Sequence, residues 1–183
     1  LTLPSSGTFG LSDTATNATA RARQQALAAL LGEGREHTLV AETADGLANA
    51  INLSAIVNPV ISATNTTVQS LFTTNGNSLA AQLQQVAKLI AARDTFGVKR
   101  QVFFVSLGGF DTHTNQLATQ VTLLSQVDSA MRSFYDATLA LGVADKVTTF
   151  TQTDFGRTFK PAAGGGSDHA WGNHHFIMGG AVI

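Results

Sequence analysis

Hydrophobic residues recur with helical spacing through the first part of the chain. The clearest stripe lies in residues 79–93, where one helix face carries Leu79, Leu83, Val86, Leu89 and Ile90. Weaker patterns predict helices at 13–31 and at 37–63, the second of which Pro59 is expected to end or kink. A Pro/Gly/Ser-rich segment, 1–12, is expected to be extended. The N-terminal half is therefore predicted to be helical.

The pattern changes after Gly97. A short apolar run rich in β-forming residues, 101–107, predicts a fully buried strand. A long helix is expected at 115–141, beginning at Thr114 or Asn115, with an inward face of Leu117, Val121, Leu124, Met131 and Phe134. Further strands are expected at 146–153 and 174–183, after which the alternation of helices and strands predicts an α/β fold. We expect a mostly parallel sheet flanked by helices, with 101–107 and 146–153 as neighbouring parallel strands.

The length of 183 residues suits one domain or part of a larger one. On this interpretation residues 1–100 are a mainly helical segment, an insertion or a lid. Residues 101–183 are the α/β core segment that carries the motifs. The chain begins with Leu1, and we expect it to be an internal fragment of a longer protein.

Composition excludes several classes of function. The formal net charge is −1 and basic residues are not clustered, so no nucleic-acid partner is expected. No apolar run approaches the roughly 18 residues of a membrane span. Charged residues are only 13% of the chain, a composition common in secreted and envelope proteins. Cysteine is absent, so any metal ligands must be oxygen or nitrogen atoms.

Four of the five histidines lie in two short stretches, "GGFDTH" (108–113) and "SDHAWGNHH" (167–175). Ligands in parallel sheets gather at the carboxyl ends of strands, where Asp111 and His113 follow the first expected strand and Asp154 and Arg157 follow the second. Asp168 and His169 lie in an expected Gly-rich loop. The candidate metal ligands are Asp111, His113, Asp168 and His169, with His174 and His175 as secondary candidates. We expect the first four side chains to converge. The alternative is a pair of polar turns whose histidines have no common ligand.

Arg157 follows the predicted strand 146–153 and is a candidate for contacting an oxyanion such as phosphate or sulfate. The alternative is a salt bridge to Asp154 or another loop carboxylate. The residues themselves do not decide between these two roles.

Three motifs, "VFFVSLGGFDTH", "VTTFTQTDFGRT" and "GGGSDHAWGNHHFIMGGAV", resemble in order and spacing a bacterial family of exported proteins, domain of unknown function 1501. Members of that family often carry twin-arginine signals, which implies a periplasmic or extracellular location. The family is similar to the alkaline phosphatase and sulfatase superfamily of α/β metallohydrolases. The resemblance therefore implies an alkaline-phosphatase-like fold, of which this chain would be part, and divalent ions, with Zn or Mn as candidates.

By this resemblance Asp111 and His113 would serve one ion, and Asp168 and His169 mainly a second. The Asp-to-His spacing of two is shorter than the spacing of four usual in the superfamily, and Ala170 stands where Gly is usual. The superfamily's further metal-binding Asp, its Ser or Thr nucleophile and a final His have no counterpart in the chain. Residues 1–183 alone are therefore expected to bind metal weakly and to lack hydrolase activity.

Two hypotheses about function follow. The first is a metal-dependent hydrolase of phosphate or sulfate esters, with a small-molecule ester as substrate. The second is a non-catalytic exported or envelope module that keeps the fold for binding or for structure. The sequence leaves the catalytic residues, the substrate and the oligomeric state open.

Overall fold

The computed structural model describes residues 7–10 and 16–183, which form two compact units, Leu1–Ala63 and Thr64–Ile183. Most of the expected extended segment 1–12, and the predicted helix start at Asp13, lie outside the described residues. The helix expected at 79–93 belongs to the second unit, so the expected boundary at residue 100 does not coincide with the boundary between the two units. Whether residues 1–100 act as an insertion or a lid stays a prediction.

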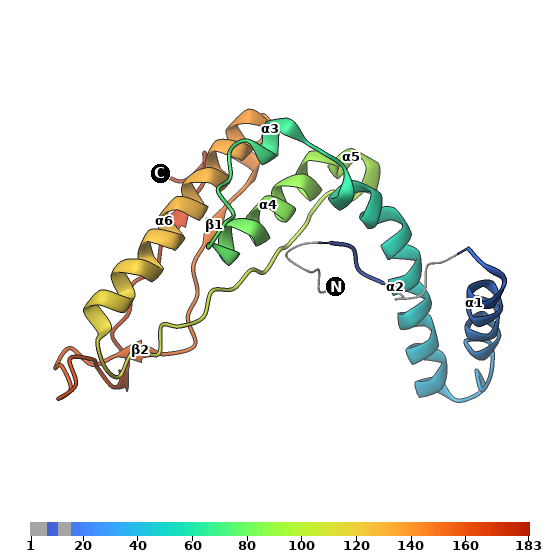
Figure 1. Cartoon of the computed structure of the whole chain (residues 1–183), viewed down its shortest axis with the longest axis horizontal. Coiled ribbons are helices and arrows are strands. Elements are labelled where there is room, and N and C mark those ends of the chain that lie inside the picture. The colour runs from blue at the N-terminus through green and yellow to red at the C-terminus, as the bar shows by residue number, and fades with distance from the viewer. Residues whose placement is uncertain (1–6, 11–15) are drawn as a thin grey trace. The chain divides into compact units, whose positions relative to one another are not determined.

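The described residues of the first unit form the helices α1 (Ala18–Leu30) and α2 (Thr38–Ser62) (Figure 1). The Asn17 side chain caps α1 by accepting a hydrogen bond from the backbone N–H of Ala20 at 2.9 Å. Pro59 lies inside the last turn of α2, which continues to Ser62. Proline has no N–H to donate to the carbonyl four residues earlier, so α2 loses one internal hydrogen bond here without ending.

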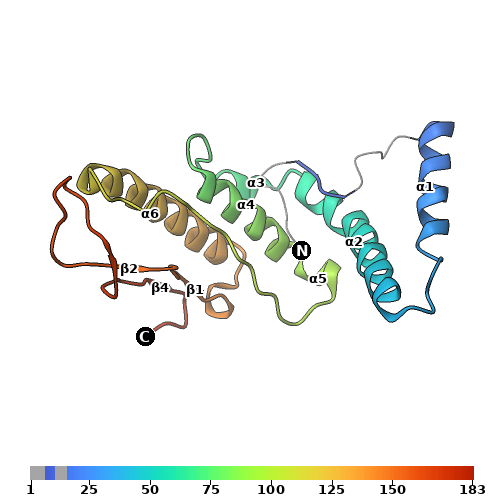
Figure 2. The ribbon, with the colours of Figure 1, turned by 90° about the horizontal axis from the view of Figure 1, so that it is seen from below.

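The second unit is built on α4 (Ser78–Ala91) and α6 (Gln116–Ala140), which pack against each other and lie side by side in Figures 1 and 2. Two short helices, α3 (Thr66–Gln69) and α5 (Arg93–Phe96), flank α4 along the chain. The predicted stripe of α4 is confirmed, because all five of its residues are buried. Four of them, Leu79, Leu83, Val86 and Ile90, belong to the core cluster of this unit. The cluster also contains Val68, Phe72, Ala130, Phe134, Ala137 and Val143.

The predicted inward face of α6 is only partly correct. Phe134 is buried against α4, but Leu117, Val121 and Leu124 are exposed. All the buried residues of α6 lie at Ala130 or beyond, so only its C-terminal half packs in the core. The N-terminal half extends toward the loops that carry the candidate ligands (Figure 2).

The expected α/β fold with a mostly parallel sheet is wrong. The structure has two separate two-stranded antiparallel sheets, β1 (Thr149–Phe150) with β4 (Ile177–Met178) and β2 (Gly156–Arg157) with β3 (His169–Ala170). Residues 101–107 form no strand, so the expected parallel pair with 146–153 is absent from the described part of the chain. The region 144–146 is a short 3-10 helix, η1 (Ala144–Lys146). An apolar extended sequence becomes a strand only where a neighbour takes up its backbone hydrogen bonds, and none does so here.

Within residues 7–10 and 16–183, no helix combines the length and the apolar character needed to cross a bilayer.

Candidate metal centre

Two loops of the second unit lie against each other at the N-terminal end of α6. The amides of Asn115 and Gln116 donate to the carbonyls of Gly164 and Gly165, at 3.1 and 3.0 Å, and the Ser167 amide donates to Thr112 O at 3.3 Å. These bonds hold residues 112–116 beside residues 164–167, although about 50 positions separate them along the chain. The loop before α6 and the loop between β2 and β3 therefore form one framework.

Gly166 permits this close approach. A Cβ at position 166 would overlap the carbonyl group of His113 and would lie 2.5 Å from the carbonyl oxygen of Thr112. Any larger residue would push the two loops apart. The glycine run thus has a steric role that its sequence alone did not reveal.

The short β2–β3 ladder brings the second half of the site into position. Arg157 and His169 are register partners, so they are cross-strand neighbours. Gly156 makes this pairing possible, because a Cβ there would lie 2.5 Å from the carbonyl oxygen of Ala170. His169 therefore projects from a strand, although the sequence predicted a loop at this position.

Asp111 is the centre of the cluster. One of its carboxylate oxygens, Oδ1, lies 2.7 Å from His169 Nε2 and 3.0 Å from His113 Nε2. Side chains of Asp111, His113 and His169 are about half exposed, at 57%, 49% and 50%. Each of them offers one ligand atom to a common point, and all three ligand atoms lie within 4.8 Å of one another.

Asp168 contacts the outer side of this group. Its Oδ1 lies 3.3 Å from His113 Nδ1, the ring nitrogen of His113 that faces away from Asp111. A carboxylate that accepts a hydrogen bond from Nδ1–H leaves Nε2 unprotonated, and an unprotonated nitrogen is the form that binds a metal. The structure thus brings Asp168 to the cluster, but outside the group of three convergent ligands.

Arg157 lies beneath the cluster, with only 14% of its side chain exposed. Its Nη1 donates to Ser167 O, and its Nη2 donates to Phe110 O at 2.6 Å and lies 3.2 Å from Asp111 Oδ1. Its Nε is buried and has no partner among the described residues. Both terminal nitrogens are thus engaged by the two loops. The salt bridge that the sequence left open forms with Asp111 and not with Asp154.

The environment of Asp111 favours its charged form. The hydrogen bond from His169 lowers the pKa of the Asp111 carboxyl from its ordinary value of 3.8. The nearby His113, His169 and Arg157 lower this pKa further by charge interactions, while partial desolvation opposes them. The carboxylate is therefore ionised over the whole neutral range, as a metal ligand must be.

Phe155 is a residue of the site that sequence reasoning missed. Its ring stacks on the His169 imidazole, with 4.1 Å between centroids and 21° between planes, and the Arg157 guanidinium carbon lies 5.1 Å from the Phe155 centroid. No signal for it was present in the sequence, because the predicted strand ends at residue 153 and β2 begins only at Gly156. The ring limits the orientations open to His169.

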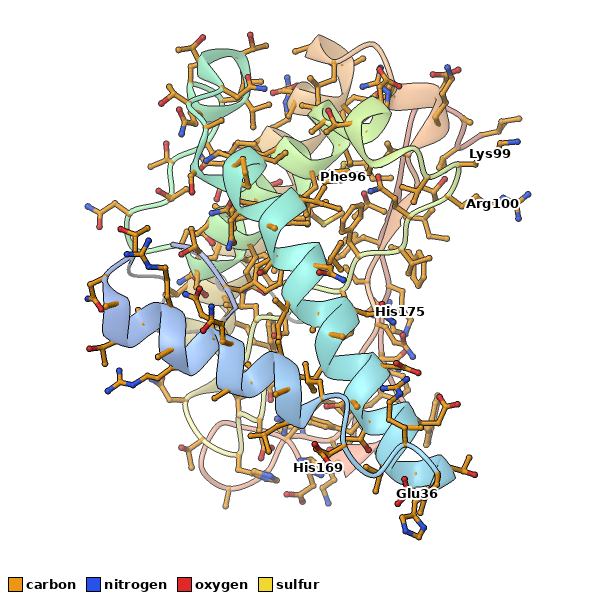
Figure 3. The ribbon with its side chains drawn as sticks, turned by 90° about the vertical axis from the view of Figure 1, so that its right-hand side faces the viewer. Glu36, Phe96, Lys99, Arg100, His169 and His175 are labelled. Atoms are coloured by element: carbon orange, nitrogen blue, oxygen red, sulfur yellow. The ribbon has the colours of Figure 1, made fainter. Side chains whose placement is uncertain are left out.

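His174 and His175, the secondary candidates, do not join the cluster. Both are exposed, and the ligand group found among the described residues contains Asp111, His113 and His169 alone. Figure 3 shows His175 well away from His169 along the C-terminal segment.

Comparison with protein families returned one match, which spans residues 4–183 and thus nearly the whole chain. The family is described as Protein of unknown function (DUF1501). The chain belongs to this family. No curated protein and no solved structure matches it.

The donor set of this DUF1501 protein has a definite chemical character. One carboxylate oxygen and two imidazole nitrogens, without sulfur, suit Zn and other first-row divalent ions. Ligands of a tetrahedral Zn ion lie about 3.4 Å apart, so the distance from Asp111 Oδ1 to each Nε2 atom would need to grow by less than about 1 Å. Three protein ligands leave one coordination position open, the arrangement typical of catalytic sites, whereas structural Zn sites have four.

Proposed function

We propose that Asp111, His113 and His169 bind one divalent ion, with Zn and Mn as the candidates, and that the site hydrolyses phosphate or sulfate esters. The observation that carries the proposal is the convergence of three ligand atoms from two loops on one half-exposed point. The ester class, and an exported location of the protein, rest on the motif resemblance described above. Hydrolysis is favoured over a purely structural role because the donor set leaves a coordination position open.

A bound divalent ion supplies a Lewis acid and lowers the pKa of a coordinated water. The residues of the chain hold the ion and orient its ligands. Asp111 contributes the negative charge of the ligand set, and Arg157 ties that carboxylate to the carbonyls of Phe110 and Ser167. The exposed side of the cluster gives an ester access to the site without movement of the core.

We assign Asp168 to the orientation of His113. Its carboxylate lies 3.3 Å from Nδ1 and so selects the tautomer whose Nε2 is free to bind the ion. The resemblance implied a different role, as a ligand of a second ion. The substitution Asp168→Ala separates the two. Loss of an orienting carboxylate lowers metal affinity about 10–100-fold at unchanged stoichiometry. Loss of a ligand to a second ion lowers the stoichiometry itself.

The test is metal binding by calorimetry and elemental analysis, with Zn and Mn as separate probes. Wild-type protein is expected to bind one ion. His169→Ala should abolish binding, and the matched control His175→Ala, which removes an exposed imidazole six positions along the chain, should not. Equal binding by both variants, with the fold retained, would reject the site.

Hydrolysis is tested separately with p-nitrophenyl phosphate and p-nitrophenyl sulfate, using the longest form of the protein available. Turnover should require the metal and be lost in His169→Ala. Stoichiometric metal binding without turnover of either ester would overturn the hydrolase proposal and favour the structural module.

A further inference from the structure

The turn before α4 contains the one Asn-Gly pair in the sequence, Asn75-Gly76. The Asn77 amide donates to the carbonyl of Thr74 at 3.2 Å, so the pair occupies the two central positions of a β-turn. Both residues of the pair are exposed, and a Cβ at Gly76 would meet no atom within 4 Å. Figure 2 shows the segment between α3 and α4 as a loop that projects from the helices. Water therefore reaches the pair freely.

Neither polar group at the centre of this turn is engaged by the described part of the chain. No described residue accepts a hydrogen bond from the Gly76 N–H, and none bonds to the Asn75 carboxamide. Gly76 has a φ of +73°, and glycine adopts such an angle without the clash of a Cβ. The missing side chain also leaves the Gly76 nitrogen unshielded. A single backbone bond, from Asn77 to Thr74, therefore opposes the rotation that would bring this nitrogen to Asn75 Cγ.

Asn77, two residues later, has the opposite environment. Its side chain is buried, and its Oδ1 accepts a hydrogen bond from the Ala80 N–H at 3.0 Å. Its Nδ2 donates to Gln126 O at 2.9 Å and to Ser129 Oγ at 3.1 Å. Three hydrogen bonds thus hold this carboxamide in place, and a side chain stands beside the nitrogen of the next residue, Ser78. Asn77 is therefore an internal control for the reactivity of Asn75.

Asp45-Gly46 is a second pair of related chemistry, and it lies inside α2. The helical backbone engages the Gly46 N–H within the helix, and the Asp45 carboxylate lies 2.6 Å from Arg35 Nη2. Both groups of this pair are therefore held, although its sequence resembles that of the turn. The structure thus separates a constrained pair in a helix from an unconstrained pair in a turn.

We propose that Asn75 is a site of spontaneous deamidation, with water as the only co-reactant. The Gly76 nitrogen attacks Cγ of Asn75 and forms a five-membered succinimide ring, while the Cγ–Nδ2 bond breaks. Ammonia leaves with the proton that the Gly76 nitrogen loses. Water then opens the ring at one of two bonds. Cleavage of the new N–Cγ bond gives aspartate, and cleavage of the original peptide bond gives isoaspartate, whose main chain runs through Cγ.

The two products have different effects on α4. No acidic residue lies in the first turn of this helix, so an aspartate just before it complements the helix dipole. Isoaspartate instead lengthens the main chain by one atom between Thr74 and Asn77, which disrupts the turn that places the Asn77 cap. Weakening of this cap alone should lower Tm by about 2–4 °C. The reaction needs no metal, so this proposal and the proposed metal centre can fail separately.

The experiment follows the loss of amide at single positions. The 183-residue chain and the longest form of the protein available are incubated at neutral and at mildly alkaline pH. Mass spectrometry of proteolytic fragments, with sequencing through 75–77, separates Asn75 from Asn77. Methylation by an isoaspartyl methyltransferase counts isoaspartate. Asn75 should lose its amide many times faster than Asn77, and faster at the higher pH because the attacking nitrogen must lose its proton. Asp45 should yield no isoaspartate.

Three variants test the mechanism. Asn75→Gln keeps an amide, but its longer side chain would have to form a six-membered ring, so the loss of ammonia should fall to the level of Asn77. Gly76→Ala places a Cβ beside the attacking nitrogen at a positive φ and should slow the reaction several-fold. Asn75→Asp supplies the aspartate product alone, and its Tm should equal or exceed that of fresh wild type. An aged fraction enriched in isoaspartate should melt lower.

Three outcomes overturn the proposal. The first is that Asn75 keeps its amide as long as Asn77 does, in either form of the protein. The second is that Gly76→Ala reacts as fast as the wild type, and the third is aspartate without isoaspartate at position 75, since neither result is compatible with a succinimide. An equal Tm for the isoaspartate fraction and for Asn75→Asp would reject the effect on the α4 cap.

Discussion

Gly166 makes the candidate metal centre sensitive to a single methyl group. In Gly166→Ala the new Cβ would overlap the carbonyl of His113 and lie 2.5 Å from Thr112 O, so both obstacles are backbone atoms. A flexible side chain could move aside, but these carbonyls belong to the loop that carries two of the ligands. The two loops must therefore separate. Separation would move His169 and Asp168 away from Asp111 and His113.

Overpacking of this kind costs about 1–3 kcal/mol. For a chain of this size that corresponds to a fall of about 2–12 °C in Tm, at 2–4 °C for each kcal/mol. Because the ligands separate, metal affinity should fall as well, and the loss of affinity should be larger than the loss of stability alone explains. Differential scanning calorimetry gives the first quantity and calorimetric titration with Zn gives the second.

Gly108→Ala is the matched control. It lies in the same loop as the ligand Asp111, but a Cβ there meets no atom within 4 Å and its φ is not in the left-handed region. Its free energy of unfolding should change by no more than about 0.5 kcal/mol. If Gly166→Ala and Gly108→Ala have the same Tm and the same metal affinity, the close approach of the loops does not hold the site.

Three further predictions concern single side chains. Asn77→Ala should lower the free energy of unfolding, measured by denaturant titration, by about 2–3 kcal/mol. The reason is that Asn77 caps α4 and also donates to Gln126 O at 2.9 Å from a buried position. Asn17→Ala removes an exposed cap without such a link and should lower it by only about 1 kcal/mol. Arg157→Lys should cost about 1.5–3 kcal/mol, because one ammonium group cannot reproduce the fork that joins two carbonyls and a carboxylate, and near-identical thermal melts would contradict this reading. The pKa of Asp111 is lowered from 3.8, so its contribution to stability is present above that value and is lost as the pH falls through the lowered pKa. Acid titration of stability should therefore be steeper below pH 3.8 in the wild type than in Asp111→Asn, and parallel curves would refute it.

The sequence by itself determined the helices of the second unit. The stripe of α4 and the extent of α6, expected at 115–141 and found at Gln116–Ala140, follow from the spacing of apolar residues within each segment, although Asn115 makes no side-chain capping bond. A helix makes its hydrogen bonds between residues four apart, so the information needed to form it is local. The same local information singled out Asp111, His113, Asp168 and His169 as candidate ligands, with His174 and His175 as secondary candidates, because it requires only the recognition of residue types at short spacing.

Only the tertiary structure decided which of these segments meet. Residues 101–107 have the composition of a buried strand, yet none of the residues that the structure describes pairs with them, and the short sheets among those residues are antiparallel. Leu117 has the spacing of a core residue, yet α6 projects beyond α4 and leaves it in solvent. Strand pairing and burial depend on partners that are distant along the chain, and no short pattern contains that partner.

The site shows the same division at the scale of single atoms. The choice between an oxyanion contact and a salt bridge for Arg157 could not be made from its neighbours in sequence. The loops place Phe110 O, Ser167 O and Asp111 around the guanidinium, which shows the salt bridge, while the contact with an oxyanion stays a prediction. Likewise, nothing in the sequence was a reason to propose His169 as a ligand and Asp168 as the carboxylate that orients His113. That assignment needs the β2–β3 register and the close approach at Gly166, both of which are contacts between segments that only folding brings together.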